Sequence, residues 1–351
     1  MIGLAIYQMI FSVTFSRSFL LKMLLRQVLC PRDGDHSGFQ FSISTLSNID
    51  ILDMGINVCY DHSLPLLMHP FSDEVFTNPS KLENLQFNCL AFGQDLPCSI
   101  FSITTLVVLK LKCVTFKDFS SVQLPSLKAL HLDYFAFSKS QHFIDLLNGC
   151  PLLEILEVRS VAFDCVDDPS SGRNFTTLSK LVRADFCHTL TDFYLPVRIF
   201  YNVEFLRIEE FCDVDIPIFP NLIHLDLIFR RNLKWESVFD MLNHCPQLQI
   251  FVLHNLYRTP SMVWPNTHVI PECFSSQLRT CWLTELTGTK CEMTFAKFIM
   301  QNSTLLRTMK ISSNRYLSHE KNLEMRKELN SCPRSSASCE LLFPDGSNYI
   351  W

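Results

Sequence analysis

Cysteine and histidine are the side chains in this sequence that could hold a metal ion or act as a nucleophile. The chain has 15 Cys and 11 His among 351 residues. No Cys-x-x-Cys occurs, and no group of Cys and His has the spacing of zinc ligands. We therefore assign no metal site and no Cys/His nucleophilic pair. Many cysteines instead stand at or beside apolar positions, where a free thiol buries like a small hydrophobic side chain. Their odd number and irregular spacing favour a reducing compartment, the cytoplasm or the nucleus.

The remaining polar residues offer no stronger chemistry. Asp167 and Asp168 form an acidic pair among Pro, Ser and Gly, which is more typical of an exposed loop than of a metal site. His62 and His69 lie near acidic residues without ligand spacing. No phosphate-binding, dinucleotide-binding, nucleophile-elbow or zinc-protease motif occurs, and only 9 Gly are present. We predict no catalytic, cofactor-binding or metal-binding residues, and no enzyme activity.

Composition narrows the classes of partner. The net charge is −5, with 30 Lys and Arg against 35 Asp and Glu and no basic stripe, so we expect no nucleic-acid binding. The apolar run Met1–Phe15 is too short for a transmembrane helix, and no basic segment precedes it, so we expect no membrane association. Apolar residues make up 48% of the chain and charged residues 19%, which is enough for a large core.

A repeated pattern of apolar residues predicts the strands that position the polar side chains. Eleven segments have the pattern apolar-x-x-apolar-x-apolar, where x is any residue. From Leu82 onward they begin 19 to 30 residues apart, close to the roughly 20–29-residue period of leucine-rich repeats. This predicts an α/β leucine-rich-repeat solenoid, a horseshoe with parallel strands on its concave face. The segments are Leu46/Ile49/Ile51, Leu82/Leu85/Phe87, Leu106/Leu109/Leu111, Leu127/Leu130/Leu132, Leu153/Leu156/Val158, Leu181/Ala184/Phe186, Val203/Leu206/Ile208, Leu222/Leu225/Leu227, Leu248/Phe251/Leu253, Leu278/Cys281/Leu283 and Leu306/Met309/Ile311.

A second phrase recurs inside the array. A helical segment, then Asn-x-Cys-Pro, then a strand occurs at Asn148–Pro151, Asn243–Pro246 and Asn330–Pro333. Pro forbids continuation of a helix, and Gly149 in the first copy suits a helix end. Outside the repeats, the apolar spacing predicts a helix over Ser18–Leu29, and Leu64–Pro79 is expected to be an irregular loop.

The residues between the apolar strand positions are predicted to lie on the concave face, because side chains alternate along a strand. For any one of them a solvated sheet face is the more common explanation. Taken together, we predict that they bind a protein partner, with Trp282 as the best anchor. They are Lys110, Lys112, His131, Asp133, Glu157, Arg159, Arg183, Asp185, Arg207, Glu209, His224, Asp226, His254, Trp282 and Lys310.

The C-terminal part resembles a known family. Val269-Ile-Pro-Glu-Cys-Phe-Ser-Ser-Gln-Leu-Arg-Thr280, then Gly288-Thr-Lys-Cys-Glu292, resembles the opening of the FBD domain of plant F-box/FBD/leucine-rich-repeat proteins. The end is similar too, with Lys327-Glu-Leu-Asn-Ser-Cys-Pro-Arg-Ser-Ser336 followed by a strand at Cys339–Phe343. Upstream, Leu96–Phe101 and the repeat Leu124–Leu132 are similar to the family's repeats, so the resemblance covers roughly residues 96–343.

The repeat pattern predicts a non-repeat segment over residues 1–45 and repeats over 46–270. The resemblance implies an FBD domain over 271–345 that continues and closes the solenoid, followed by a tail over 346–351. It also implies a substrate-recognition subunit of an SCF-type ubiquitin ligase, whose F-box docks on the Skp-family linker while the repeats hold an unknown protein substrate. Residues 1–45 show no Leu-Pro opening and no Lys-Arg-Trp, so they carry no recognisable F-box, which argues against linker binding.

Two alternatives stay open at this point. One is a secreted or receptor-type leucine-rich-repeat ectodomain, and the other is a fragment without function. Disulfides would favour the ectodomain, whereas free thiols would favour the F-box-related protein.

Overall fold

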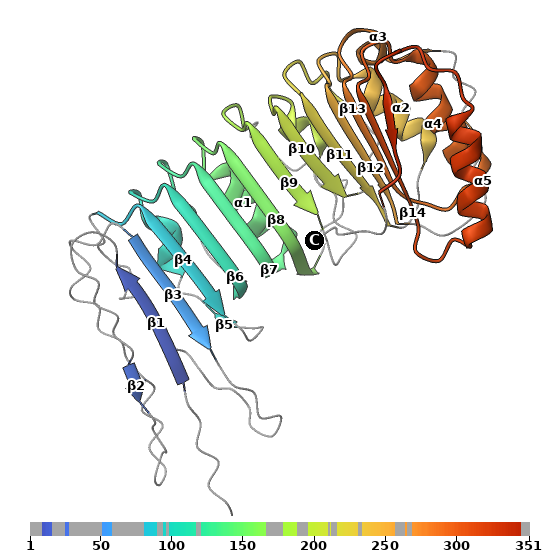
Figure 1. The fold of residues 1–351 in the computed structure, drawn as a ribbon. Coiled ribbons are helices and arrows are strands. Elements are labelled where there is room, and N and C mark those ends of the chain that lie inside the picture. Colours follow the sequence, from blue (N-terminus) through green and yellow to red (C-terminus); the bar gives the residue numbers. More distant parts are fainter. Residues whose placement is uncertain are drawn as a thin grey trace, which may run out of the picture. The chain divides into compact units, whose positions relative to one another are not determined.

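The computed structural model describes residues 9–15, 25–27, 51–57, 81–89, 94–95, 98–116, 121–165, 178–187, 196–209, 211, 216–230, 234–256, 264 and 269–344. The chain divides into two compact units, whose helices and strands are labelled in Figure 1. Unit 1 comprises Met1–Leu181 with His188–Phe193, and unit 2 comprises Val182–Cys187 with Tyr194–Trp351. Each unit has its own succession of neighbouring parallel strands, and each is described separately below.

Unit 1 is built on five parallel strands, each paired with the next along the chain. They are β3 (Ile51–Asn57), β4 (Asn84–Cys89), β6 (Val108–Phe116), β7 (Ala129–Lys139) and β8 (Ile155–Cys165). The other elements are β1 (Met9–Phe15), β2 (Leu25–Gln27), β5 (Gln94–Asp95), the 3-10 helix η3 (Cys98–Ser102) and α1 (Ser140–Asn148). Strand β1 pairs antiparallel with both β2 and β3.

Two expectations fall in this N-terminal region. The helix expected over Ser18–Leu29 is wrong where it can be compared, because Leu25–Gln27 form strand β2 against β1. Pairing with a neighbouring strand has overridden the local helical spacing there. The rest of that segment and the expected loop Leu64–Pro79 lie outside the described residues.

Unit 2 repeats the arrangement with seven strands, again each parallel to its neighbour. They are β9 (Arg183–Cys187), β10 (Phe205–Glu209), β11 (His224–Phe229), β12 (Ile250–Asn255), β13 (Thr280–Leu286), β14 (Thr308–Ser313) and β15 (Glu340–Leu342). The helices are η4 (Val197–Phe200), α2 (Trp235–Asn243), α3 (Glu272–Ser276), α4 (Lys290–Asn302) and α5 (His319–Asn330). The predicted α/β class with parallel repeat strands is confirmed.

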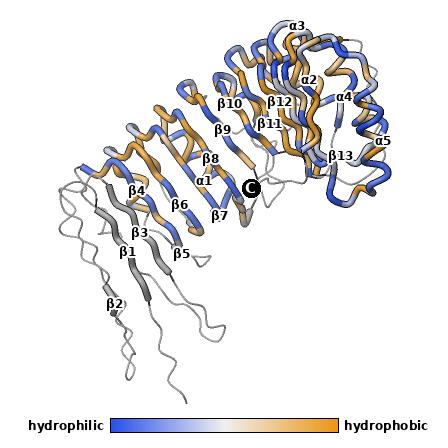
Figure 2. Tube along the Cα trace, in the orientation of Figure 1, coloured by the Kyte–Doolittle hydropathy of each residue, from blue (hydrophilic) through white to orange (hydrophobic). Residues whose placement is uncertain are grey.

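The apolar positions of the repeat pattern form the core of each unit. In unit 1, Leu109, Leu130 and Leu156 are buried at equivalent places on three successive strands, and in unit 2 Leu225 and Phe251 do the same. Hydrophobic residues recur along the labelled strands of both units (Figure 2). Burial at about 25 cal/mol per Å² of apolar surface makes this rank of side chains the main stabilising contribution.

Three neighbouring strands of unit 1 carry a residue in the left-handed region just after the face positions. Cys113, Tyr134 and Ser160 have φ of 57°, 52° and 54°. Each inserts one residue into the alternation, so that Leu132 and Phe135, three positions apart, both point into the core. The spacing apolar-x-apolar-x-x-apolar-x-apolar in all three strands is the sequence signal for this irregularity.

Ser160 gives a direct test of that backbone conformation. A β-branched side chain is strongly disfavoured at positive φ, so Ser160→Val should lower the free energy of unfolding by about 1–3 kcal/mol. Ser160→Gly should leave it unchanged or raise it, because glycine adopts this conformation without strain. Urea unfolding of both variants checks this, and equal stability of the valine and glycine variants would contradict the assignment.

The Asn-x-Cys-Pro phrase marks three helix ends, as predicted. Helices α1, α2 and α5 each end at the Asn of the phrase. In the first two copies the thiol caps the helix, since Cys150 Sγ donates to the carbonyl of Leu146 at 3.1 Å and Cys245 Sγ donates to that of Met241 at 3.0 Å. Carbonyls at a helix end lack partners within the helix. Burial raises the pKa of the Cys150 thiol to about 12, which keeps it protonated and able to donate.

Gly149 is required at the end of α1 for a different reason than the sequence indicates. Its φ is −76°, which any residue adopts, so it is not a left-handed cap. A Cβ at this position would lie 2.5 Å from Cγ1 and 2.7 Å from Cβ of Val122. The close approach of the neighbouring chain is what excludes a side chain.

Gly149→Ala should therefore lower the free energy of unfolding by about 1–3 kcal/mol through overpacking. Of the three nearest atoms, Val122→Ala removes only Cγ1 and leaves the Cβ and the carbonyl oxygen of Val122 at 2.7 and 2.8 Å from the new side chain, so it should recover only a small part of the loss. The measurement is urea unfolding of the two single variants and the double variant. A Gly149→Ala variant as stable as wild type would contradict a steric cause.

Candidate functional site

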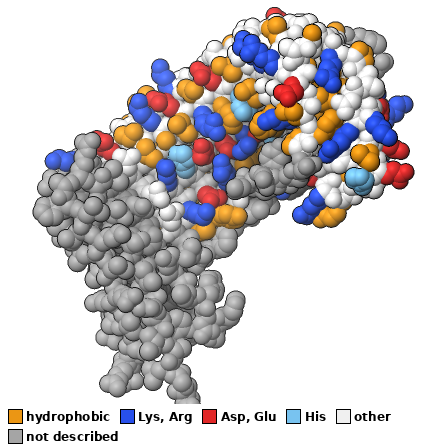
Figure 3. Space-filling view, viewed as in Figure 1, with side chains coloured by type: hydrophobic (Ala, Val, Ile, Leu, Met, Phe, Trp, Pro, Cys, Tyr) orange, Lys and Arg blue, Asp and Glu red, His pale blue; other side chains and the backbone are white. Residues whose placement is uncertain are grey.

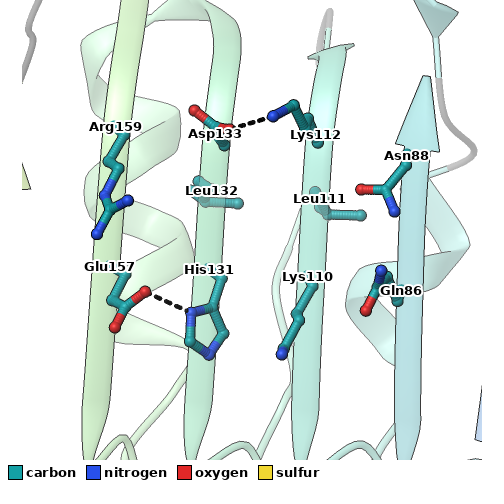
Figure 4. A pocket seen from close by; sticks show the side chains of 10 residues that line it. All are labelled: Gln86, Asn88, Lys110, Leu111, Lys112, His131, Leu132, Asp133, Glu157 and Arg159. Carbon is teal, nitrogen blue, oxygen red and sulfur yellow. Dashed lines mark hydrogen bonds and ion pairs between the residues drawn. The ribbon is translucent and has the colours of Figure 1, made fainter. Parts of the chain in front are cut away.

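The strand face of unit 1 contains an open hollow across β4, β6, β7 and β8 (Figure 4). Its polar side chains alternate along each strand with buried apolar ones, as the pleat of a strand requires. Because the strands are in register, they form a grid of two rows, with Gln86, Lys110, His131 and Glu157 in one row and Asn88, Lys112, Asp133 and Arg159 in the other. The lining residues are Gln86, Asn88, Lys110, Leu111, Lys112, His131, Leu132, Asp133, Glu157 and Arg159.

Both acidic residues of the hollow have a cationic or imidazole neighbour on the adjacent strand. Lys112 Nζ lies 2.8 Å from Asp133 Oδ2, and His131 Nδ1 lies 3.0 Å from Glu157 Oε2 (Figure 4). The hydrogen bond to Asp133 raises the pKa of Lys112 above its usual 10.5. Both pairs are partly exposed, so they contribute little to stability and remain open to exchange with a partner.

In unit 2 the corresponding face holds a more deeply buried ionic cluster. Arg207 Nε donates to Asp226 Oδ2 at 2.7 Å, and its Nη1 lies 3.6 Å from Asp185 Oδ2. Asp226 is 2% exposed and Asp185 0%. Burial opposes ionisation of Asp226, but His254 and Arg207 outweigh it and hold its pKa below the usual 3.8. A carboxylate this buried is tolerated because it is paired.

Asp226 also belongs to a chain of three side chains that resembles a nucleophilic triad. His254 Nε2 lies 3.0 Å from Asp226 Oδ1, and His254 Nδ1 is hydrogen-bonded to Thr284 Oγ1 at 2.7 Å. However, Thr284 is 1% exposed and His254 3%, so no substrate can reach the hydroxyl. The arrangement is a buried polar network that fixes β11, β12 and β13 relative to one another.

Aromatic and basic side chains lie together at two further places on the face of unit 2. Lys310 Nζ lies 4.2 Å from the centre of the Trp282 ring, and the two residues are paired across β13 and β14. The Arg183 guanidinium lies 3.6 Å from the Phe205 ring, which packs against His224 at 4.7 Å. Burial lowers the pKa of His224, so this imidazole is neutral at pH 7.

The fifteen residues predicted to bind a partner all lie on described strands, but they are not equally accessible. Six gather in the hollow of unit 1. Of the nine in unit 2, Asp185, Glu209, Asp226 and His254 are buried, at 0%, 7%, 2% and 3% exposure. They pair instead with neighbours, Glu209 with Arg230 at 2.6 Å among them. Acidic and basic side chains are interspersed on the strand faces (Figure 3).

Some residues of the site escaped the prediction. Gln86 and Asn88 line the hollow and occupy on β4 the positions that Lys110 and Lys112 occupy on β6. The same alternation after Leu85 would have found them. Thr284 could also have been found, because it follows Leu283 as the predicted His254 follows Leu253, and the two residues are in register. Arg230 carried no such signal, because it lies just beyond the end of β11.

Within the described part of the chain, no group of three or more His, Cys, Asp and Glu could hold a metal ion. No described helix is long and apolar enough to cross a membrane. The ten cysteines whose side chains are described are all free thiols.

Comparison with known proteins adds the family context. Residues 266–311 match the FBD family, and residues 78–171 match the leucine-rich repeats of an FBD-associated F-box protein. A putative FBD-associated F-box protein of Arabidopsis thaliana is 28% identical over 68% of this chain and 66% of its own length. A putative F-box/FBD/LRR-repeat protein of the same plant is 27% identical over 80% of this chain and 79% of its own length. An F-box/FBD/LRR-repeat protein from that plant is 27% identical over 72% and 69%.

The first of these matches falls on α3, β13, α4 and β14 of unit 2, and the second on β4 to β8 of unit 1. The matched segments therefore contain parallel strands of both units. In both segments the chain is similar to the plant F-box/FBD/LRR-repeat proteins.

Proposed function

We propose that this chain is a protein-binding leucine-rich-repeat module without enzymatic activity. In this proposal the repeats form a horseshoe that the FBD segment continues and closes. The strand face holds a protein substrate for an SCF-type ubiquitin ligase. The matched relatives support this role, since all three names combine an F-box with FBD and two of them also name leucine-rich repeats.

The observation that carries the proposal is the register of polar side chains on the strand faces. In unit 1 eight polar residues stand in two rows on four strands, while the opposite side of the same strands is packed into the core. Side chains on a packed sheet are held in place before binding, which lowers the entropy lost on association. In unit 2, the stacked pair Trp282 and Lys310 offers an aromatic anchor of the kind enriched in interfaces.

The state of the cysteines supports the cytoplasm or nucleus as the compartment. A secreted ectodomain of this class would be expected to carry paired cysteines, whereas the ten described thiols are free and most are buried. Nothing observed favours a fragment without function, because the repeat cores of both units are closely packed.

The ligase part of the proposal is tested by co-expressing the chain with a Skp-family linker and a cullin. Retention of both proteins on the tagged, folded chain would establish an adaptor despite the absence of a recognisable F-box in residues 1–45. Failure to retain the linker would contradict adaptor function for residues 1–351 and restrict the chain to holding a partner. Thermal unfolding of the same preparation shows that the chain tested is folded.

A further inference from the structure

We infer that the hollow of unit 1 binds an extended acidic segment of the partner protein, with a carboxylate of that segment at Lys110. The inference deepens the proposed protein-binding function and rests on it. It assigns a ligand class to one part of the face. Its basis is the distribution of charge across the eight polar residues of the grid.

The grid is electrostatically divided between its two pairs of strands. On β4 and β6, Gln86 is paired with Lys110 and Asn88 with Lys112, so this half holds two ammonium groups and no acid. On β7 and β8 the other half holds His131, Asp133, Glu157 and Arg159, in which two acids offset the basic groups. An anionic group is therefore favoured over β4 and β6.

Lys110 is the cation best placed to receive that anion. Its neighbour Lys112 is already engaged by Asp133 at 2.8 Å, and Glu157 is engaged by His131 at 3.0 Å. Lys110 is exposed, and the two ion pairs given above for the described residues of the hollow are those of Lys112 and His131, not of Lys110. A carboxylate brought to Lys110 would thus gain a charge-assisted hydrogen bond without displacing an internal pair.

The side chains beside Lys110 add hydrogen-bond donors. Gln86 and Asn88 on β4 lie next to the two lysines of β6, and their carboxamides are directed into the hollow (Figure 4). A carboxamide NH₂ supplies two donors and no charge. One acidic side chain can therefore be bound by an ammonium and an amide together.

The shape of the hollow favours a peptide over a small anion. It is open and extends over four strands, about 14 Å at the usual spacing of 4.7–4.9 Å between strands. No enclosing wall would hold a free phosphate, and lysine lacks the planar fork with which arginine binds phosphate bidentately. An extended chain can place one acidic residue over β6 and a neutral or basic residue over the acids of β7 and β8.

The net charge of the protein means that an acidic peptide would bind only where cations are grouped locally. With a net charge of −5, the protein as a whole repels an acidic peptide. Binding of such a peptide must then depend on a local group of cations, and it should weaken as salt is added.

The test uses the full chain and two fluorescein-labelled peptides, (Glu-Ser)4 and (Lys-Ser)4, titrated by fluorescence anisotropy at low salt. An extended peptide with a period of two presents all its charges on one side. We expect wild type to prefer the acidic peptide, and Lys110→Glu to weaken its binding roughly tenfold, since one attraction becomes a repulsion. Lys180→Glu makes the same charge change at an exposed position of unit 1 outside the hollow and should change binding less than twofold.

A gain of function guards against a trivial loss through misfolding. Lys110→Glu should bind (Lys-Ser)4 more tightly than either wild type or Lys180→Glu does. Misfolding of Lys110→Glu would not produce this difference between the two variants. Equal effects of the two variants, or no preference of wild type for the acidic peptide, would overturn the inference. Displacement of the acidic peptide by inorganic phosphate, compared with sodium chloride at the same ionic strength, would also overturn it, in favour of a small-anion site. None of these failures would bear on whether the strand faces bind a protein, which is measured separately below.

Discussion

Phe295→Ala is expected to lower the free energy of unfolding of unit 2 by about 3–5 kcal/mol. Phe295 lies on α4 and is fully buried. Its ring lies 4.8 Å from that of Trp235 and 5.6 Å from that of Phe239, both on α2, and 6.2 Å from that of Phe251 on β12. Truncation would leave a cavity between two helices and a strand that cannot easily close, because these three aromatic rings and that of Trp264 surround it.

The measurement is chemical unfolding followed by tryptophan fluorescence, since Trp235 and Trp264 both lie beside the ring. Lys290→Ala, at an exposed position of the same helix, serves as the control and should change stability by less than about 0.5 kcal/mol. A loss below about 1 kcal/mol for Phe295→Ala would show that this cluster is not packed as described.

Asp226→Asn is expected to destabilise unit 2 by about 3 kcal/mol, the second large effect. The substitution keeps the shape of the side chain but leaves Arg207 without its closest acidic partner, 2.7 Å away, and removes the charge beside His254. Asp185 compensates in part, because its carboxylate lies 3.6 Å from the same guanidinium. The double variant with Arg207→Gln should be less destabilised than the sum of the two single changes.

The pH dependence of Asp226 has a definite sign. Its pKa is lower in the folded chain than the usual 3.8, so the folded state binds its proton less readily than the unfolded state does. The stability it contributes is complete above the unfolded pKa and is lost as the pH falls through the folded pKa. Urea midpoints measured between pH 7 and pH 3 should therefore fall less steeply for Asp226→Asn than for wild type. A parallel fall for both proteins would contradict the ionised buried carboxylate.

The spacing of apolar residues predicted the fold, because burial of one face of each strand requires that spacing. A strand that buries one face must place apolar residues at alternate positions, so Leu130 and Leu132 fix the direction of His131 and Asp133. The parallel strands and the placement of polar residues on the strand face follow from that single constraint. The three helix ends followed from Asn-x-Cys-Pro, because Pro cannot continue a helix.

Features that depend on tertiary contacts could not be predicted in the same way. Nothing in the sequence near His254 indicates that its ring is buried between Asp226 and Thr284, since those residues are 28 and 30 positions away. Gly149 is explained only by the approach of Val122. The strand at Leu25–Gln27 depends on its pairing with β1 rather than on its own apolar spacing.

Site-specific photo-cross-linking in plant cells shows whether the strand faces hold a protein partner. A photoreactive amino acid would replace Lys112 or Lys310 on the strand faces of the two units, or Glu236 or Glu324 at exposed positions of α2 and α5. We predict discrete cross-linked adducts from Lys112 and Lys310, containing the same partner by mass spectrometry, and none from the helical positions. Adducts from Glu236 and Glu324 alone would contradict the claim and move the binding surface to the helical side of the repeats.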